Sequence, residues 1–352
     1  MQTTGVLMIG SVPGVSSREV FTRLATALPG RLQAIPDGET GARWNWIGWQ
    51  RDSFPPAVSG KWHRDNALAE LGRFPTLTLE DIKPTRYDEA AISSYLTFKQ
   101  LRQEGVIPSN VRFQVGLPTP YSVMTGHLIP EIAKAYEHLY EQRLEESLDR
   151  ITTEIPHHDL IIQWDLCFEM TAIEFERGRF DDVRHKAYFS ESENDVVQGL
   201  RDRLVRLCDR IPQDVKLGFH LCYGDYNHKH FVEPRDTTLL VEFANALLAC
   251  ETVGRRASWI HIPVPKARVD PAYYQALAAL RLANDSGSEP TRLYLGLVHA
   301  GDEAGTKERI DVAKACVPIP FGVATECGLG RTPPEEIDSI LRICREVTSE
   351  GG

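Results

Sequence analysis

The sequence predicts an α/β protein that forms a single (β/α)8 TIM barrel over residues 1–352, and three observations support this expectation. Eight short apolar runs have the length of buried strands. Helix-like segments separate these runs at regular intervals in the second half of the chain. Residues capable of chemistry follow the strands, which is where such barrels place their active sites. The eight strand-like segments are 6–10, 32–35, 111–115, 159–164, 215–220, 258–262, 292–297 and 320–325.

The helices are expected from apolar residues that recur at helical spacing. Residues 237–253 give the clearest example, because Leu239, Phe243 and Leu247 fall on one face. The expected helices of the second half are 194–210, 237–253, 271–283, 305–315 and 334–348.

Residues 40–110 are too long for a simple connection from a strand to a helix. They contain Trp44, Trp46 and Trp49, followed by proline-rich and acidic stretches. We expect an inserted lid over the mouth of the barrel, with Trp44 as a candidate substrate contact. A small second domain is the alternative, and the tryptophans also suit simple packing of the insertion on the barrel.

Composition excludes several classes of function. The 352 residues carry a formal net charge of −10, which argues against non-specific nucleic-acid binding, because phosphate contacts need clustered Lys and Arg. No apolar run reaches the roughly 18 residues of a membrane span, and no basic region precedes the first apolar stretch, so a secretory signal is not expected. Seven cysteines without framework spacing suggest a reducing, cytoplasmic environment. A homo-oligomer stays compatible with the sequence.

Polar side chains collect at the expected strand ends. His220 and Cys222 are two residues apart, so in extended chain both point the same way. Together with Cys327 they offer one imidazole and two thiolates, a soft ligand set that suits zinc. The full set of candidates at strand ends is Ser11, Asp37, Glu39, Asp165, His220, Cys222, His299 and Cys327.

Each candidate also has an ordinary structural interpretation. Cys327 could be a core cysteine, as we expect for Cys208, Cys250, Cys316 and Cys344. Asp165 could cap a helix or pair with an arginine. Ser11 could be the N-cap of a helix that begins near Ser17, and Glu39 could stabilise a glycine-flanked turn.

The same residues carry a family resemblance. The chain resembles the catalytic barrel of cobalamin-independent methionine synthase, within the fold group that also holds uroporphyrinogen decarboxylase. Its length suits a form without the extra N-terminal barrel of the long synthases. The matching pieces, in the order of the family, are Ile9-Gly10-Ser11-Val12-Pro13, Asp37-Gly38-Glu39, Ile162-Gln163-Trp164-Asp165, His220-Leu221-Cys222-Tyr223 and Glu326-Cys327-Gly328-Leu329.

This resemblance implies roles for individual residues. His220, Cys222 and Cys327 match zinc ligands, which implies one Zn²⁺ per chain. Ser11 and Glu39 match residues that hold an amino-acid thiol, and Asp165 matches an acidic residue at its amine. His299 falls near the catalytic histidine of the family.

The chain also departs from the family pattern. Pro263 stands near the position of the fourth zinc ligand of the family, a glutamate, and proline cannot bind zinc. His261, Asp225, Glu169 or a water could complete the site instead. Leu166 replaces an acidic residue after Asp165, and residues 116–120 differ from the folate-side signature. These departures count against ordinary methionine synthesis, and most of all against methyltetrahydrofolate as the donor.

The expected function is that of a zinc-dependent transferase or lyase that makes or breaks a C–S bond by activating a small thiol. Its partner would be a small-molecule thiol or thioether, with His299 moving a proton at the leaving group. Two alternatives stay open. One is a barrel lyase or decarboxylase that acts on a sulfur-free substrate, and the other is a degenerate barrel without catalysis.

Overall fold

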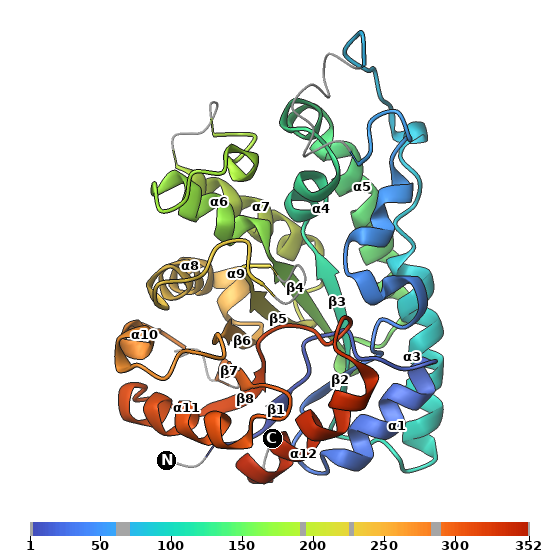
Figure 1. The fold of residues 1–352 in the computed structure, drawn as a ribbon. Helices are drawn as coiled ribbons and strands as arrows, with labels where there is room; N and C mark the ends of the chain where they lie inside the picture. Colours follow the sequence, from blue (N-terminus) through green and yellow to red (C-terminus); the bar gives the residue numbers. More distant parts are fainter. Residues whose placement is uncertain (1–2, 61–70, 191–194, 225–228, 283–289, 351–352) are drawn as a thin grey trace.

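The computed structural model describes residues 3–60, 71–190, 195–224, 229–282 and 290–350. Eight parallel strands form one sheet in the order β1-β8-β7-β6-β5-β4-β3-β2, surrounded by helices (Figure 1). This confirms the predicted (β/α)8 barrel and all eight strand positions. The strands are β1 Val6–Leu7, β2 Ala34–Pro36, β3 Arg112–Pro118, β4 Leu160–Leu166, β5 Lys216–Leu221, β6 Ala257–Pro263, β7 Arg292–Val298 and β8 Phe321–Thr325.

The barrel is nearly closed where the first and second strands meet. Val6 pairs with Val323 of β8 on one side and makes an isolated parallel bridge with Leu32 on the other. A second bridge joins Ser11 to Gly38 beyond the carboxyl ends of both strands. The loops after β1 and β2 are thereby held together at the mouth.

Helices form the outer ring. Of the described residues, the α-helices are α1 Ser17–Ala27, α3 Tyr87–Gln103, α4 Pro120–His127, α5 Pro130–Glu154, α6 Phe168–Glu176, α7 Val196–Arg210, α8 Thr238–Leu248, α9 Glu251–Gly254, α10 Pro271–Tyr274, α11 Glu303–Cys316 and α12 Ile337–Val347. Not one of the helices that the structure describes is long and apolar enough to cross a membrane.

Two expected helices differ from the prediction. The segment 237–253 is divided into α8 and α9 at Ala249 and Cys250. The segment 271–283 contains only α10 and the 3-10 helix η6, Gln275–Ala279. The reason is local, because the Asn245 side chain donates to the Ala279 carbonyl and accepts from the Arg281 N–H. These bonds satisfy the backbone groups that another helical turn would have used.

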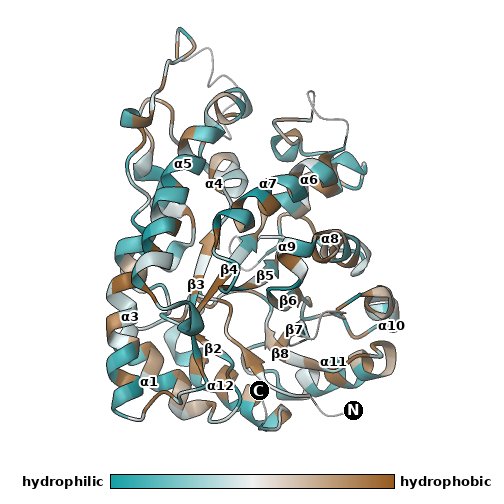
Figure 2. Ribbon diagram, turned by 180° about the vertical axis from the view of Figure 1, so that it is seen from behind, coloured by the Kyte–Doolittle hydropathy of each residue, from teal (hydrophilic) through white to brown (hydrophobic). Residues whose placement is uncertain are grey.

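The interior of the barrel is filled below the mouth. Trp259 and Tyr294 are fully buried there, and each lies against a glycine of a neighbouring strand. A Cβ at Gly218 would meet the Trp259 ring at 2.2 Å, and one at Gly322 would meet the Tyr294 ring at 2.4 Å. In Figure 2 the hydrophobic colour follows the strands, while the helices alternate between the two colours. A large cavity opens instead at the carboxyl ends of the strands.

The segment between β2 and α3 runs along α4 and α5 (Figure 1). It contains three 3-10 helices, η1 Gly41–Asn45, η2 Gly48–Ser53 and η3 Leu79–Asp81. Gln50 anchors it, because its buried side chain donates to the Thr85 carbonyl and accepts from the Tyr140 hydroxyl. Residues 61–70 lie outside the described part. That residues 40–110 act as a lid stays a prediction.

Candidate functional site

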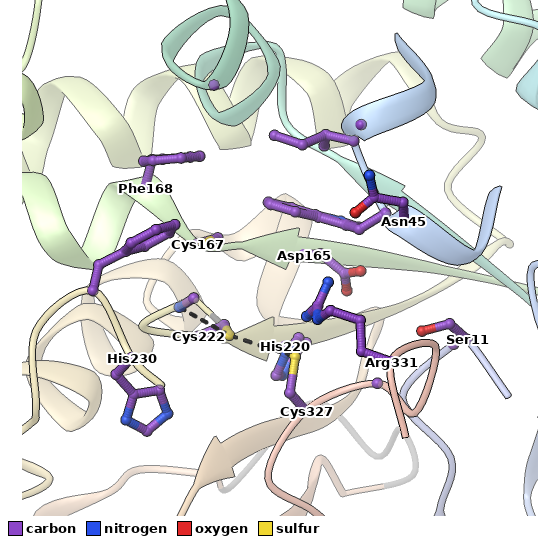
Figure 3. A pocket seen from close by; sticks show the side chains of 18 of the residues that line it. Ser11, Asn45, Asp165, Cys167, Phe168, His220, Cys222, His230, Cys327 and Arg331 are labelled. Atoms are coloured by element: carbon purple, nitrogen blue, oxygen red, sulfur yellow. Dashed lines mark hydrogen bonds between the residues drawn. The ribbon is translucent and has the colours of Figure 1, made fainter. Parts of the chain in front are cut away.

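A cavity of about 850 Å³ opens at the carboxyl ends of the strands. Six of the sequence candidates line it, namely Ser11, Glu39, Asp165, His220, Cys222 and Cys327. Figure 3 shows the two cysteines and His220 close together, with Ser11 and Asn45 to one side and Phe168 to the other. The barrel thus brings residues from five different loops and strands to one space.

The sulfur and nitrogen atoms of three side chains form a compact group. Cys222 Sγ lies 3.8 Å from Cys327 Sγ, and Cys327 Sγ lies 3.6 Å from His220 Nε2. All three atoms lie within 4.8 Å of one another. With Zn–S bonds of about 2.3 Å and Zn–N bonds of about 2.0–2.1 Å, a tetrahedral site separates two sulfurs by about 3.8 Å and sulfur from nitrogen by about 3.6 Å. The donor set and these two distances therefore fit a zinc ion.

The end of β5 holds two of these side chains by its own backbone. The Cys222 N–H donates to the Leu166 carbonyl at 2.7 Å, which extends the pairing of β4 with β5. The Gly224 N–H donates to Cys222 Sγ at 3.3 Å. Gly224 has a φ of +81°, a conformation that side chains disfavour, and this turn aims its N–H at the sulfur.

The loop after β8 positions the second cysteine. Thr325 Oγ1 donates to the Cys327 carbonyl at 2.8 Å, and the Gly330 N–H donates to Ser11 Oγ at 3.1 Å. A Cβ at Gly328 would lie 2.5 Å from Ser11 Oγ, so only glycine allows this close approach. The Cys-Gly-Leu-Gly motif thus packs on the loop that carries Ser11.

The fourth zinc position has no protein ligand among the described residues. Both ring nitrogens of His261 are used, since Nδ1 lies 2.7 Å from His220 Nδ1 and Nε2 lies 3.1 Å from the Thr325 carbonyl. Glu169 is buried outside the cavity, where it accepts from Thr119 and Ser122. Asp225 lies outside the described residues. The arrangement leaves the cavity side of the group open.

Burial and neighbouring sulfurs shape the thiol acidity. The hydrogen-bond contact with Cys167 is the largest influence raising the pKa of Cys222 well above its ordinary value. The contact with Cys222 does the same for the pKa of Cys327. Thiols packed this closely stay protonated unless a cation binds between them.

Two carboxyl groups lie in another part of the cavity. Burial raises the pKa of Glu39 to about 8, with the nearby Asp165 as the next cause. Burial likewise raises the pKa of Asp165 to about 8. Gly10 and Gly116 leave room for the Glu39 carboxyl group, because a Cβ at these positions would lie 3.0 Å and 3.1 Å from Glu39 Oε1. The pair favours a shared proton or a cationic group of a ligand over two negative charges.

The Asp165 carboxyl is held by amide groups inside the barrel. Gln163 Nε2 donates to Asp165 Oδ1 at 2.8 Å, and Gln114 Nε2 donates to Gln163 Oε1 at 3.0 Å. Gln114 is itself held by the carbonyls of Met8 and Ile9. This network orients the Asp165 carboxyl toward the cavity. Asp165 therefore does not act as a helix cap. Nor is Ser11 an N-cap, since Ser16 caps α1 by accepting from the Glu19 N–H.

Three sequence candidates do not line the cavity. Asp37 accepts from both Nη atoms of Arg43 and from Ser94 Oγ, so it braces the loop after β2. Trp44 is 50% exposed, while Trp46 lines the cavity in its place. His299 lies behind the cavity wall, where its Nε2 is 3.1 Å from the Val264 carbonyl, and burial lowers its pKa to about 4.

His230 is a cavity residue that the sequence reasoning missed. Its Nε2 lies 3.2 Å from Glu326 Oε1, and its Nδ1 lies 3.3 Å from Glu233 Oε2. Burial opposes its positive charge, but the two glutamates outweigh burial and raise its pKa. Glu326 Oε2 also lies 3.9 Å from His299 Nδ1, so one carboxylate connects the two histidines.

Other missed residues complete the cavity. Cys167 follows β4 directly and touches Cys222, so its place after a strand was a signal in the sequence. Phe168 stacks on Phe231 with ring centroids 5.1 Å apart and forms an aromatic wall. Arg331 lines the cavity four residues after Cys327, just beyond the Cys-Gly-Leu-Gly motif. Phe231 and His230 lie in an irregular loop that no sequence pattern marks.

No family model matches the sequence, and no curated protein matches it either. Among solved structures, the chain is similar to a B12-independent methionine synthase from Shewanella sp. W3-18-1 in complex with selenomethionine. The TM-score is 0.49 at 13% identity, over 98% of this chain and 95% of that chain. A similarity of this size assigns no family, and the fold and site described above stand on the geometry of this chain alone.

Proposed function

We propose that this protein is a zinc-dependent enzyme that activates a small thiol and makes or breaks a bond between carbon and sulfur. The observation that carries the proposal is the grouping of His220, Cys222 and Cys327 on the wall of a large cavity, with Cys327 Sγ at zinc-site distances from both other donor atoms. Three protein ligands with an open fourth position are the pattern of catalytic zinc sites, whereas structural sites have four.

One zinc ion per chain, held by these three side chains, would deprotonate a substrate thiol at neutral pH and keep its sulfur nucleophilic. A free thiol has a pKa near 8.5, so little of it is thiolate without such help. Two cysteine thiolates reduce the positive charge of the site, which suits a sulfur nucleophile better than strong Lewis-acid hydrolysis.

The remainder of the cavity orients the thiol substrate. Asp165 and Glu39 accept hydrogen bonds from an amine or hydroxyl of the substrate, and Ser11 borders the same space. Arg331 supplies a positive charge for a substrate carboxylate. The motif resemblance to cobalamin-independent methionine synthase supports an amino-acid thiol, and the altered residues 116–120 argue against methyltetrahydrofolate as the donor.

A proton donor is needed at the leaving group. In the transfer direction the thiolate sulfur gives an electron pair to carbon, the bond from carbon to the leaving group breaks, and the leaving group takes up a proton. His230 lines the cavity and has a raised pKa, so it is the proposed donor. His299, the candidate from sequence, positions His230 through Glu326.

A second function is favoured by one observation, the buried pair of Glu39 and Asp165 with raised pKa values. Carboxyl groups of this kind serve as general acids and bases near neutral pH. They would suit a lyase or decarboxylase that acts on a sulfur-free substrate.

The experiment that separates the two functions combines metal analysis with a thiol assay. The protein, purified without chelator, should contain about one zinc per chain, and free thiol should be consumed or released from mixtures of amino-acid thiols and alkyl donors. Removal of zinc should abolish this turnover and its return should restore it. Turnover of a sulfur-free substrate that survives complete removal of zinc would contradict the proposal and establish the lyase.

A further inference from the structure

We propose that His261 is a positioning residue that fixes the tautomer of His220. It holds the hydrogen of the neutral His220 ring on Nδ1, so that the Nε2 lone pair faces the metal position. The backbone carbonyl of Thr325 sets the direction of this chain of hydrogen bonds. The inference rests on the zinc site proposed above, but it concerns hydrogen positions that can be measured with or without metal.

Three contacts in line connect a backbone carbonyl to the metal position. His261 Nε2 lies 3.1 Å from the Thr325 carbonyl oxygen, and His261 Nδ1 lies 2.7 Å from His220 Nδ1. His220 Nε2 lies 3.6 Å from Cys327 Sγ. Both rings are buried, with 0% and 2% of their surface exposed, so they depend on each other for hydrogen bonds.

Only one arrangement of two neutral rings satisfies these contacts. A carbonyl oxygen can only accept, so His261 Nε2 must carry the hydrogen. The other nitrogen of His261 then has a lone pair and accepts from His220 Nδ1–H. That bond leaves the lone pair of His220 on Nε2, which is the nitrogen near Cys327.

The opposite arrangement fails at one of the contacts. A hydrogen on His220 Nε2 would leave a lone pair on its Nδ1, so His261 Nδ1 would have to donate. His261 Nε2 would then present a lone pair to the Thr325 carbonyl, and two acceptors would face each other at 3.1 Å in a buried site. A buried hydrogen bond left unmade is destabilising, which selects the first arrangement.

The topology explains why these residues meet. His220 and His261 are partners in register on β5 and β6, at the same height in the barrel. Thr325 ends β8, two residues before the ligand Cys327, and its side chain also holds the Cys327 carbonyl. The end of β8, which is followed by the ligand Cys327, therefore also sets the orientation of the ligand His220 through His261. His261 thus supports the site without binding the metal, which leaves the fourth position to the substrate.

The direct test is nitrogen-15 NMR of the histidine rings in the wild-type protein. In metal-free protein, the proposal expects hydrogen on Nδ1 of His220 and on Nε2 of His261. With zinc added, His220 Nε2 should shift to the range of a metal-bound nitrogen while His261 stays unchanged. Hydrogen on His220 Nε2 in the metal-free protein, or metal bound to either nitrogen of His261, would overturn the proposal.

Variants test the energetic consequence through zinc affinity, measured by competition with a chelator. His261→Phe keeps a flat ring but cannot accept, and it should weaken zinc binding by about 10–100-fold, the usual effect of losing a partner of a ligating histidine. His261→Gln should recover part of this loss, since an amide can accept from His220 and donate to Thr325. Equal losses in both variants would point to packing alone and contradict the proposal.

Tyr294→Phe is the matched control, because Tyr294 is the buried β7 partner of His261 in register. It removes a buried hydroxyl that lies 3.4 Å from Gln33 Oε1 and makes no hydrogen bond with His220, so zinc affinity should stay within a few-fold of wild type. Failure of the proposed function is distinguishable from failure here. A protein that binds zinc through His220 Nε2 but transforms no thiol would leave the role of His261 intact.

Discussion

The two ends of the cavity are built by different physical means. At the sulfur end, His220, Cys222 and Cys327 group three donor atoms within 4.8 Å of one another, and two of the distances between them match those of a tetrahedral zinc site. At the carboxyl end, Glu39 and Asp165 lie buried with raised pKa values. At the sulfur end, the two thiols become thiolates only when a cation binds them. At the carboxyl end, Glu39 and Asp165 do not both carry a negative charge unless a cationic group lies beside them.

This difference defines the polarity of the proposed substrate. A molecule with a thiol at one end and an amine or other polar group at the other satisfies both ends at once. Neither end alone would identify a substrate, because buried carboxyl pairs and soft metal sites each occur in many enzymes. Substitutions at the sulfur end should therefore have the largest effects on zinc binding and turnover, and those at the carboxyl end smaller ones.

Loss of a sulfur ligand should have the largest effect. Cys222→Ser replaces a thiolate by a hydroxyl that binds zinc poorly, so zinc content after dialysis should fall from about one per chain to near zero and turnover should vanish. Cys208→Ser is the matched control, since Cys208 is equally buried but lies in α7, away from the cavity. Equal zinc content in the two variants, measured by elemental analysis, would remove Cys222 from the site.

His230→Gln should have the next largest effect, about 10²–10⁴-fold on kcat, as expected for loss of a general acid. Zinc content should stay at the wild-type level, because His230 is not among the three ligands. The alkaline fall of the pH–rate profile should also disappear. An unchanged profile together with a small loss of kcat would assign the proton transfer to another group.

Asp165→Asn should affect the carboxyl end alone. The amide keeps the size of the side chain but loses a charge-assisted hydrogen bond to the substrate, worth about 1.5–3 kcal/mol, so kcat/KM should fall about 10–100-fold. Zinc affinity should not change. A matching loss of zinc in this variant would mean that the two ends are not independent.

Glu39→Gln should act on neither zinc ligand nor proton donor, and its effect should be a change in the pH dependence of stability. The pKa of Glu39 rises from 4.5 to about 8 on folding. The folded protein therefore binds more protons than the unfolded chain in this window, and stability is lost as pH rises from about 4.5 to about 8. Thermal unfolding between pH 5 and pH 9 should show a flatter decline in the variant. Parallel curves would contradict the raised pKa.

The sequence predicted the barrel and the sulfur end because both follow from local patterns. Buried strands are apolar runs, and residues at their ends meet at one mouth whatever their distance along the chain. The spacing of His220 and Cys222 on one strand therefore specified a shared direction, and Cys327 followed from the same rule.

The remainder of the site depends on loops and on packing, which such patterns do not encode. Asp37 and Glu39 are two residues apart after the same strand, but Arg43 and Ser94 draw Asp37 away from the cavity. His230 reaches the cavity from an irregular segment, and His299 lies behind Glu326 although it follows a strand. These placements arise from contacts between distant parts of the chain.

In the proposed site, three side chains hold zinc and leave one position for a substrate sulfur. X-ray absorption at the zinc edge tests this arrangement most directly, on protein alone and with L-homocysteine, L-cysteine or 2-mercaptoethanol added. The account predicts two sulfur neighbours at about 2.3 Å and one imidazole nitrogen, with a third sulfur when a thiol binds. A zinc-free protein that does not take up added zinc, or a sulfur count that stays at two with every thiol, would contradict it.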